Sequence, residues 1–354
     1  MTKSSVRIHS LDYLRGLAAL GIMLYHMHLL NFGETDSSSP LAVIKIYAVT
    51  IFFILSGLTL YKVYYHSLSY ETIRIFFIKR VFRIVPLLWL ATLLTFLLSE
   101  EAYTLKKMAV NMLVLPGILK PETFIANGAW SIGNELGFYL FFPLIILLVQ
   151  RNVNYLIALF LGSLVPFLYF TYFVLDPEVP LGLQWSRYVS PFNQFTFFLV
   201  GMGLGALRQA PASLVRAAPY LFLVTLAMLF AYPVSGEPIH LTSGNNRIVL
   251  SILTTLLCYF IYIADFSFLP SAAQWALSTL GEISYSVYLI HPIVYALIRI
   301  AMGEAAVSQP YILIASTVVA SLVVSYFVYQ YFEKYFMNLA KYFNVSKKST
   351  VTVK

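Results

Sequence analysis

The sequence predicts an all-α integral membrane protein with about ten transmembrane helices. Of the 354 residues, 60% are hydrophobic and only 11% are charged, whereas about a quarter of the residues of an ordinary soluble domain are charged. The apolar residues gather in runs of about 20, the length that an α-helix needs to cross a bilayer. Most of the basic residues lie between these runs, where they set the orientation of membrane helices.

The same composition excludes several classes of protein. A charged fraction of 11% cannot cover a water-facing surface of this size, which excludes a soluble enzyme and a disordered scaffold. The net charge of +8 comes from residues between apolar runs, so we expect no nucleic-acid partner. The single cysteine, Cys258, leaves no partner for an internal disulfide, and the six histidines show no ligand spacing, so we expect no metal site.

Ten apolar runs predict the transmembrane helices in chain order. The first run follows Lys3 and Arg7, as a signal peptide would, but Asp12 and Arg15 interrupt it and no small-residue cleavage site follows. We therefore predict a retained helix there. The ten predicted helices cover residues 11–31, 41–61, 84–99, 129–149, 155–175, 191–207, 217–234, 248–264, 281–301 and 310–332.

Two shorter segments are predicted to lie at the membrane without crossing it. Residues 74–83 read RIFFIKRVFR, and basic residues among aromatic ones are typical of an interfacial amphipathic helix. The apolar stretch 108–119 contains Pro116 and Gly117 and is too short to cross comfortably, so it is predicted to be re-entrant or interfacial.

The basic residues predict the orientation of the chain. With the N-terminus inside, 15 of the 23 basic residues fall on the cytoplasmic side and 5 on the opposite side. This bias favours cytoplasmic N- and C-termini. No internal repeat or long soluble insertion is visible, so residues 1–354 are predicted to form one polytopic membrane domain, with a core at about 8–335 and a cytoplasmic tail at 336–354.

The first helix carries charges that the membrane disfavours. A charge inside a bilayer costs at least a few kcal/mol, so it marks a functional site by default. The eleven-residue step from Arg15 to His26 returns to within about 20° of the same direction while rising about 16 Å, so both line one face. Asp12 lies three residues before Arg15 and can pair with it, while His28 points elsewhere. Alternatively, Arg15 snorkels to the interface and His26 sits at the outer helix end.

Five segments in order resemble a known family. The first is LDYLRGLAALGIMLYH, in which ten residues separate the arginine from the histidine. The others are FFILSG at 52–57, RVFR at 80–83 ahead of Ile84 and Pro86, Trp130-Ser131 with Glu135 before Phe138-Tyr139-Leu140, and SYSVY at 284–288 before His291-Pro292. Together they resemble the acyltransferase-3 family of integral membrane O-acyltransferases, over nearly the whole chain.

The resemblance implies a reaction and a location. It implies transfer of an acyl group, usually acetyl, from acetyl-CoA or another acyl-CoA at the cytoplasmic side to a hydroxyl of a carbohydrate or glycolipid. Such chemistry modifies polysaccharides of the cell envelope, which places the protein in the lipid bilayer of a bacterial inner (plasma) membrane. Some relatives carry an additional soluble domain for delivery, so the core here either completes the reaction or works with a separate delivery protein.

The predicted catalytic residues are His26, Arg15, Asp12 and Glu135. A neutral imidazole can remove the proton of a hydroxyl or carry the acyl group transiently, so His26 is either the base or an acyl relay. We expect Arg15 to contact the donor or to stabilise negative charge on the thioester oxygen, unless it only forms a clasp with Asp12. Glu135 either orients His26, binds an acceptor hydroxyl or packs as a protonated side chain.

The donor phosphates need basic partners, and Arg74, Lys79, Arg80 and Arg83 offer them. The competing interpretation is that these four residues set topology and bind anionic lipid headgroups. The resemblance favours Arg80 and Arg83 as functional.

The substrate-binding candidates are weaker. They are Trp130, Ser131, Tyr139, Ser56, Tyr288 and His291. Ser131, Glu135 and Tyr139 share one side of the fourth helix. Ser56-Gly57 is more typical of close helix contact, and a histidine before a proline, such as His291, is often structural.

Two other functions compete with the enzyme. Spaced ionisable residues also mark the substrate paths of transporters and flippases, but the two halves show no matched pair of broken helices. A non-catalytic membrane sensor is a third interpretation, and the intact spacing of Arg15 and His26 speaks against it.

Overall fold

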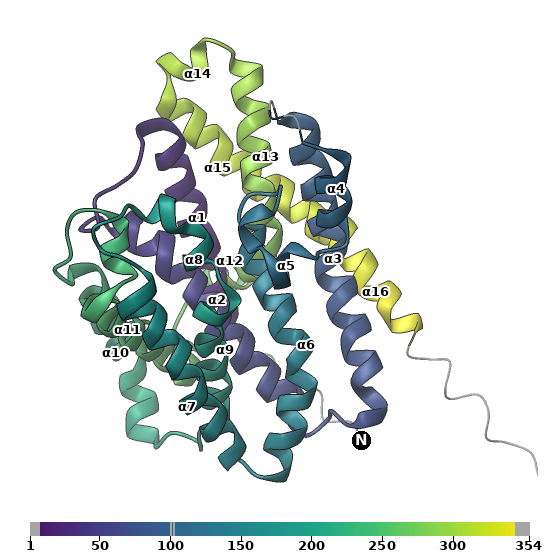
Figure 1. The fold of residues 1–354 in the computed structure, drawn as a ribbon, viewed down its shortest axis with the longest axis vertical. Coiled ribbons are helices and arrows are strands. Elements are labelled where there is room, and N and C mark those ends of the chain that lie inside the picture. Colours follow the sequence, from purple (N-terminus) through teal and green to yellow (C-terminus); the bar gives the residue numbers. More distant parts are fainter. Residues whose placement is uncertain (1–7, 100, 102, 344–354) are drawn as a thin grey trace, which may run out of the picture.

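The computed structural model describes residues 8–99, 101 and 103–343, with only the backbone described at Ile118 and Leu119. Within these ranges every regular element is helical (Figure 1). The α-helices are α1 (His9–Phe32), α2 (Pro40–Tyr64), α3 (Ile73–Leu98), α4 (Leu105–Met112), α5 (Pro116–Leu119), α6 (Ala129–Arg151), α7 (Asn154–Tyr169), α8 (Trp185–Tyr188), α9 (Pro191–Ala206), α10 (Ala212–Ala231), α11 (Gly244–Ile263), α12 (Ser271–Glu282), α13 (Ser284–Met302), α14 (Ala305–Ser308), α15 (Pro310–Phe327) and α16 (Lys334–Tyr342). Short 3-10 turns lie at Tyr70–Thr72, Pro121–Thr123, Leu181–Gln184 and Pro238–Leu241, and π turns at Phe170–Val174 and Val328–Glu333.

Eight helices are long and apolar enough to cross a membrane, which confirms the all-helical membrane class. They lie at Pro40–Tyr64, Tyr70–Leu98, Ala129–Arg151, Asn154–Val174, Ala212–Ala231, Gly244–Ile263, Ser284–Met302 and Pro310–Tyr342. The other two predicted runs also form helices, α1 and α9, but α9 has only 16 residues. The count of ten, like the side on which the termini lie, stays a prediction.

Three predicted boundaries differ from the structure. Residues 74–83 are not a separate interfacial helix, because α3 runs without interruption from Ile73 to Leu98. The ninth predicted run is divided, since α12 ends at Glu282 and α13 begins at Ser284. Residues 336–342, predicted as tail, are helical in α16, and residues 344–354 lie outside the described part of the chain.

The stretch 108–119 is divided between two short helices, α4 and α5. Neither reaches the length of a spanning helix. Helix α5 packs closely on α6, because a Cβ atom on Gly117 would lie only 2.6 Å from the Cα atom of Gly133. Its re-entrant or interfacial position stays a prediction.

Helix α2 is the central element of the bundle. In its most apolar stretch 78% of the residues are buried inside the protein, against 17% in the corresponding stretches of Asn154–Val174 and α10. It approaches α9 closely, since a Cβ atom on Gly57 would lie 3.0 Å from the backbone nitrogen of Met202. Gly57 therefore permits close helix contact, as the Ser56-Gly57 pattern predicts.

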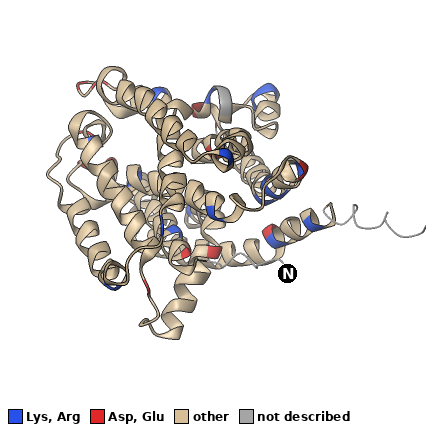
Figure 2. Cartoon of the chain, turned by 90° about the horizontal axis from the view of Figure 1, so that it is seen from below, with Lys and Arg blue, Asp and Glu red and all other residues tan. Residues whose placement is uncertain are grey.

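Few charged residues interrupt the helices. Figure 2 shows that most of the ribbon carries neither a basic nor an acidic side chain. The single cysteine, Cys258, lies on α11 and is fully buried. The charged side chains that do lie inside the bundle therefore stand out, and several of them meet at one place.

Candidate active site

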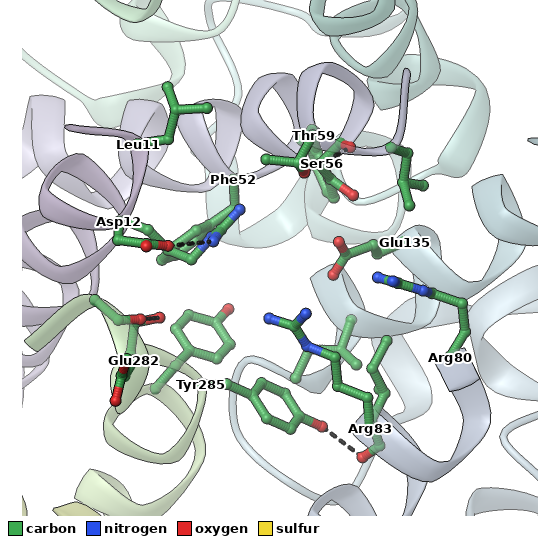
Figure 3. A pocket seen from close by; sticks show the side chains of 18 of the residues that line it. Leu11, Asp12, Phe52, Ser56, Thr59, Arg80, Arg83, Glu135, Glu282 and Tyr285 are labelled. Atoms are coloured by element: carbon green, nitrogen blue, oxygen red, sulfur yellow. Dashed lines mark hydrogen bonds and ion pairs between the residues drawn. The ribbon is translucent and has the colours of Figure 1, made fainter. Parts of the chain in front are cut away.

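A cavity of about 460 Å³ opens among α1, α2, α3, α6, α12, α13 and the last helical segment (Figure 3). Its lining contains four basic and four acidic side chains, which are Arg15, Lys62, Arg80, Arg83, Asp12, Glu135, Glu282 and Glu333. Such a concentration of charge in an otherwise apolar bundle indicates a functional site, for example one that binds a charged ligand. Nine of the fourteen predicted site residues line it: Asp12, Arg15, Ser56, Arg80, Arg83, Ser131, Glu135, Tyr139 and Tyr288.

The start of α1 forms one wall of the cavity. The Nη1 atom of Arg15 lies 3.3 Å from the Oδ1 atom of Asp12, the pairing that their three-residue spacing predicts. Helix α12 packs against this turn, because a Cβ atom on Gly281 would lie 2.6 Å from the carbonyl carbon of Asp12. The missing side chain at Gly281 thus allows α12 to hold the start of α1 in place.

Helix α3 contributes two guanidinium groups one turn apart. Arg80 is half-buried and lies over the rings of Tyr64, Phe76 and Tyr139, with distances of 5.7, 5.9 and 5.8 Å from its Cζ atom to the ring centroids. These cation–π contacts fix its direction. Arg83 extends into the cavity, and both guanidinium groups lie beside Glu135 in Figure 3.

The other two basic residues of this segment take a different position. Arg74 and Lys79 are exposed and do not belong to the lining. Arg83 is exposed as well, but it lines the cavity, so Arg80 and Arg83 share the cavity side of α3 and Arg74 and Lys79 do not.

A chain of hydroxyl groups holds Glu135. Tyr139, one turn further along α6, donates its proton to the carboxylate of Glu135. Because that proton is used, the Oγ atom of Ser56 donates to the Tyr139 oxygen, 2.8 Å away. Glu135 is thus oriented by α2 and α6 inside the cavity, and not against His26.

Helices α6 and α13 meet at Tyr288. Its hydroxyl lies 3.0 Å from the carbonyl oxygen of Gly128 and 2.9 Å from the Oγ atom of Ser131. Gly128 has φ +77°, a conformation that favours glycine, and a Cβ atom there would lie 2.8 Å from the Tyr288 hydroxyl. The ring of Tyr288 also meets Phe52 edge-on, with centroids 5.8 Å apart.

His26 and His291 form a pair outside the cavity. The Nδ1 atom of His26 lies 2.8 Å from the Nε2 atom of His291, and the rings are nearly parallel, with an angle of 19° between their planes. The Nδ1 atom of His291 lies 2.8 Å from the carbonyl oxygen of Val287. His291 is fully buried, whereas His26 is half-buried. No sequence pattern pairs these two histidines.

Apolar side chains lie between the cavity and the histidine pair. Ala19 and Met23 occupy α1 between Arg15 and His26 and belong to an apolar cluster with Val287. Phe52 packs on this cluster and also lines the cavity, so it contacts both regions.

The structure places Trp130 away from the cavity. Its ring packs edge-on against Phe53, Trp185 and Tyr188, with centroids 6.4, 5.6 and 5.8 Å apart. Trp130 is thus part of the aromatic core behind the cavity.

Several residues that line the cavity are not among the predicted site residues. They are Thr59, Lys62, Glu282, Tyr285, Glu333 and Met337. Glu333 is only 5% exposed, and its carboxylate accepts a hydrogen bond from Ser286. A carboxylate directly after a predicted span resembles an interfacial residue, so nothing local indicates its burial. Met337 lies in the predicted tail, where no site residue was expected.

The described residues contain no group of three or more His, Cys, Asp or Glu side chains that can hold a metal ion.

Two comparisons connect this chain with known proteins. A family model described as "Acyltransferase domain" matches residues 8–330. The chain is also 25% identical over 291 residues to "Putative acetyltransferase ORF330" of Acidianus two-tailed virus, covering 78% of this chain and 80% of the viral protein. No solved structure is significantly similar to the chain.

Proposed function

Since the chain belongs to the acyltransferase-3 family, we propose that it is a membrane O-acetyltransferase that moves an acetyl group from acetyl-CoA to a hydroxyl of a carbohydrate or glycolipid. The named acetyltransferase from the virus supports the choice of acetyl. The observation that carries the proposal is the course of α1, which runs from a charged cavity at Arg15 to a histidine pair at His26. The bacterial inner membrane as its location stays part of this proposal.

The donor binds in the cavity. Its phosphates meet Arg80 and Arg83, whose guanidinium groups suit bidentate contacts with phosphate oxygens. Arg15 lies further along, at the wall formed by α1 and α12, where it contacts the donor. The hydroxyls of Ser131 and Tyr288 also line the cavity, and Tyr288 precedes His291 by three residues on α13.

His26 acts as the base. It removes the proton of the acceptor hydroxyl while the hydroxyl oxygen forms a bond to the thioester carbonyl carbon. The bond between carbon and sulfur then breaks, and the leaving thiolate takes the proton from His26. The products are an acetyl ester and the free thiol of coenzyme A, and His26 is neutral again.

The acceptor approaches from the far end of α1. There the Tyr25 hydroxyl lies 3.0 Å from a carboxylate oxygen of Glu34, and the Nζ atom of Lys45 lies 2.6 Å from the same carboxylate. Lys45 also lies over the Tyr25 ring, 5.4 Å from its centroid. An aromatic ring with charged hydrogen-bonding groups suits a sugar with several hydroxyls.

The test uses membranes that contain the protein at matched amounts. They are incubated with acetyl-CoA, with and without a crude glycan fraction, and free thiol is followed for wild type, His26→Ala and His28→Ala. His28 lies two residues further on the same helix and contacts Phe32, so it is the matched control. We expect acceptor-stimulated thiol release that falls by about 100-fold or more in His26→Ala and is retained in His28→Ala.

Two results would contradict the proposal. If the wild type releases no thiol above empty membranes with acetyl, succinyl or longer donors, the protein is not an acyltransferase of this kind, and uptake of an unmodified substrate becomes the next measurement. If His26→Ala keeps its activity, another residue is the base. Acetyl-histidine found on the chain when the acceptor is omitted would assign the acyl relay to His26 in place of the base.

A further inference from the structure

His291 lies against backbone carbonyl groups that accept hydrogen bonds and cannot donate them. Its Nδ1 atom is 2.8 Å from the carbonyl oxygen of Val287, and the carbonyl of Tyr288 interacts with the same ring. The Tyr288 carbonyl lacks its usual helical partner, because Pro292 has no N–H group. The Nδ1 atom of His291 therefore carries a proton.

This proton fixes the protonation of both rings. A neutral imidazole has one N–H group and one lone pair, so the Nε2 atom of His291 accepts. The nitrogen that faces it is Nδ1 of His26, 2.8 Å away, which must donate. The lone pair of neutral His26 then lies on its Nε2 atom. His26 thus donates a hydrogen bond to His291, and His291 donates one to the carbonyl oxygen of Val287.

The surroundings favour neutral rings. His291 is fully buried. The adjoining cluster of Ala19, Met23, Val287 and other apolar side chains contains no carboxylate. A charged imidazolium in such a place costs several kcal/mol unless it is paired. The charge that His26 gains when its Nε2 atom is protonated therefore lasts only until the leaving thiolate takes that proton.

We propose that His291 is the positioning residue of the reaction: it holds His26 in the tautomer whose Nε2 atom is free to take the acceptor proton. This inference rests on the proposed function, in which His26 is the base. His291 contacts neither substrate. It acts through the hydrogen bond to His26 Nδ1, which stops the ring from rotating and stabilises the imidazolium that forms when Nε2 is protonated.

A matched pair of substitutions tests this role. Glutamine and methionine are close in length and volume, but only glutamine offers an acceptor oxygen near the position of the imidazole Nε2 atom. Steady-state kinetics with acetyl-CoA and acceptor are measured for His291→Met and His291→Gln at matched amounts of folded protein. We expect His291→Met to lower kcat by about 100-fold with a KM for the donor within about twofold of wild type. The kcat of His291→Gln should be at least about tenfold higher than that of His291→Met.

A spectroscopic measurement on the unmodified protein avoids any problem of folding. Solid-state ¹⁵N NMR of histidine-labelled, tag-free protein distinguishes protonated from unprotonated ring nitrogens, and comparison with His26→Gln assigns the His26 signals. We expect an Nδ1–H, bare Nε2 ring at His26 in the wild type.

The outcomes separate this inference from the proposed function. A kcat of His291→Met within about twofold of wild type, with His26→Ala inactive, would overturn the role of His291 and leave the function standing. Equal kcat values for His291→Met and His291→Gln, or an Nε2–H tautomer at His26 in the wild type, would overturn it as well. Absence of acceptor-stimulated thiol release from the wild type would instead remove the proposed function itself.

Discussion

The two halves of α1 lie in opposite surroundings. The first half, with Asp12 and Arg15, forms the wall of a cavity that contains four basic and four acidic side chains. The second half, with His26, faces an apolar cluster in which His291 is its polar partner. The difference indicates a division of work along one helix: charged groups bind and orient a charged donor at one end, and a neutral imidazole moves a proton at the other. Four variants test this division.

The largest effect is expected at Arg15. Arg15→Lys keeps the positive charge but loses the planar pair of donors, so we expect kcat/KM for acetyl-CoA to fall by about 100-fold. The measurement is the rate of thiol release over a range of acetyl-CoA concentrations. An activity within about threefold of wild type would instead mean that Arg15 is a clasp for Asp12, and the first half of α1 would then have a structural role only.

A smaller effect is expected at the two cavity-lining arginines of α3. The double substitution of Arg80 and Arg83 to glutamine should raise the KM for acetyl-CoA by about tenfold or more, since each charged hydrogen bond contributes ~1.5 kcal/mol or more. The same double substitution at Arg74 and Lys79, which are exposed on the same helix, is the control. We expect it to change that KM by about twofold at most. Equal effects of both pairs would indicate that these residues serve topology and lipid headgroups.

Tyr139 should have a moderate effect. Tyr139→Phe removes the hydroxyl that donates to Glu135 and accepts from Ser56. We expect kcat to fall about fivefold, in line with ~1 kcal/mol for one hydrogen bond. Tyr47→Phe is the control, because the Tyr47 hydroxyl bonds to the carbonyl of Leu241 and does not reach the cavity. If both variants lose activity equally per folded molecule, the network around Glu135 acts on stability alone.

The smallest effect is expected at the boundary between the two regions. Phe52→Leu replaces the ring between the cavity and the histidine pair with a smaller side chain. Longer acyl groups should therefore be transferred faster relative to acetyl. We expect the ratio of propionyl to acetyl transfer to rise about fourfold, given ~0.8 kcal/mol for the one additional buried methylene. Phe138→Leu, at a ring that packs on Phe195 and Phe198 and does not line the cavity, should leave the ratio unchanged. An unchanged ratio in both variants would show that Phe52 does not limit the passage.

Much of the fold could be predicted because spanning helices are a local property of the chain. Each needs about 20 apolar residues in a row, and that pattern needs no knowledge of distant neighbours. The boundaries were less predictable. Basic residues at 74–83 suggested a separate helix, but α3 continues through them, and the basic groups at positions 80 and 83 line the cavity.

The candidate site likewise contains residues that the sequence predicts and residues that it does not. Arg15 and Glu135 could be found because a charge in an apolar run stands out in the sequence, and Arg80 because its segment resembles that of the family. The contact of His26 with His291 joins residues 265 positions apart, and no periodicity within one helix indicates such a neighbour. The same holds for Glu333 and Met337, which reach the cavity only because the helix after α15 continues through a π turn and packs against α3.

The burial of Cys258 makes the chain suited to labelling at one chosen position. Its thiol has no contact with solvent, so a maleimide that cannot cross membranes should leave the wild type unlabelled. A cysteine added at Val307, which is 80% exposed, or at Tyr70, which is 70% exposed, then supplies the only reactive thiol. With cytoplasmic termini, the reagent should label Val307→Cys in intact cells and Tyr70→Cys only after the membrane is opened.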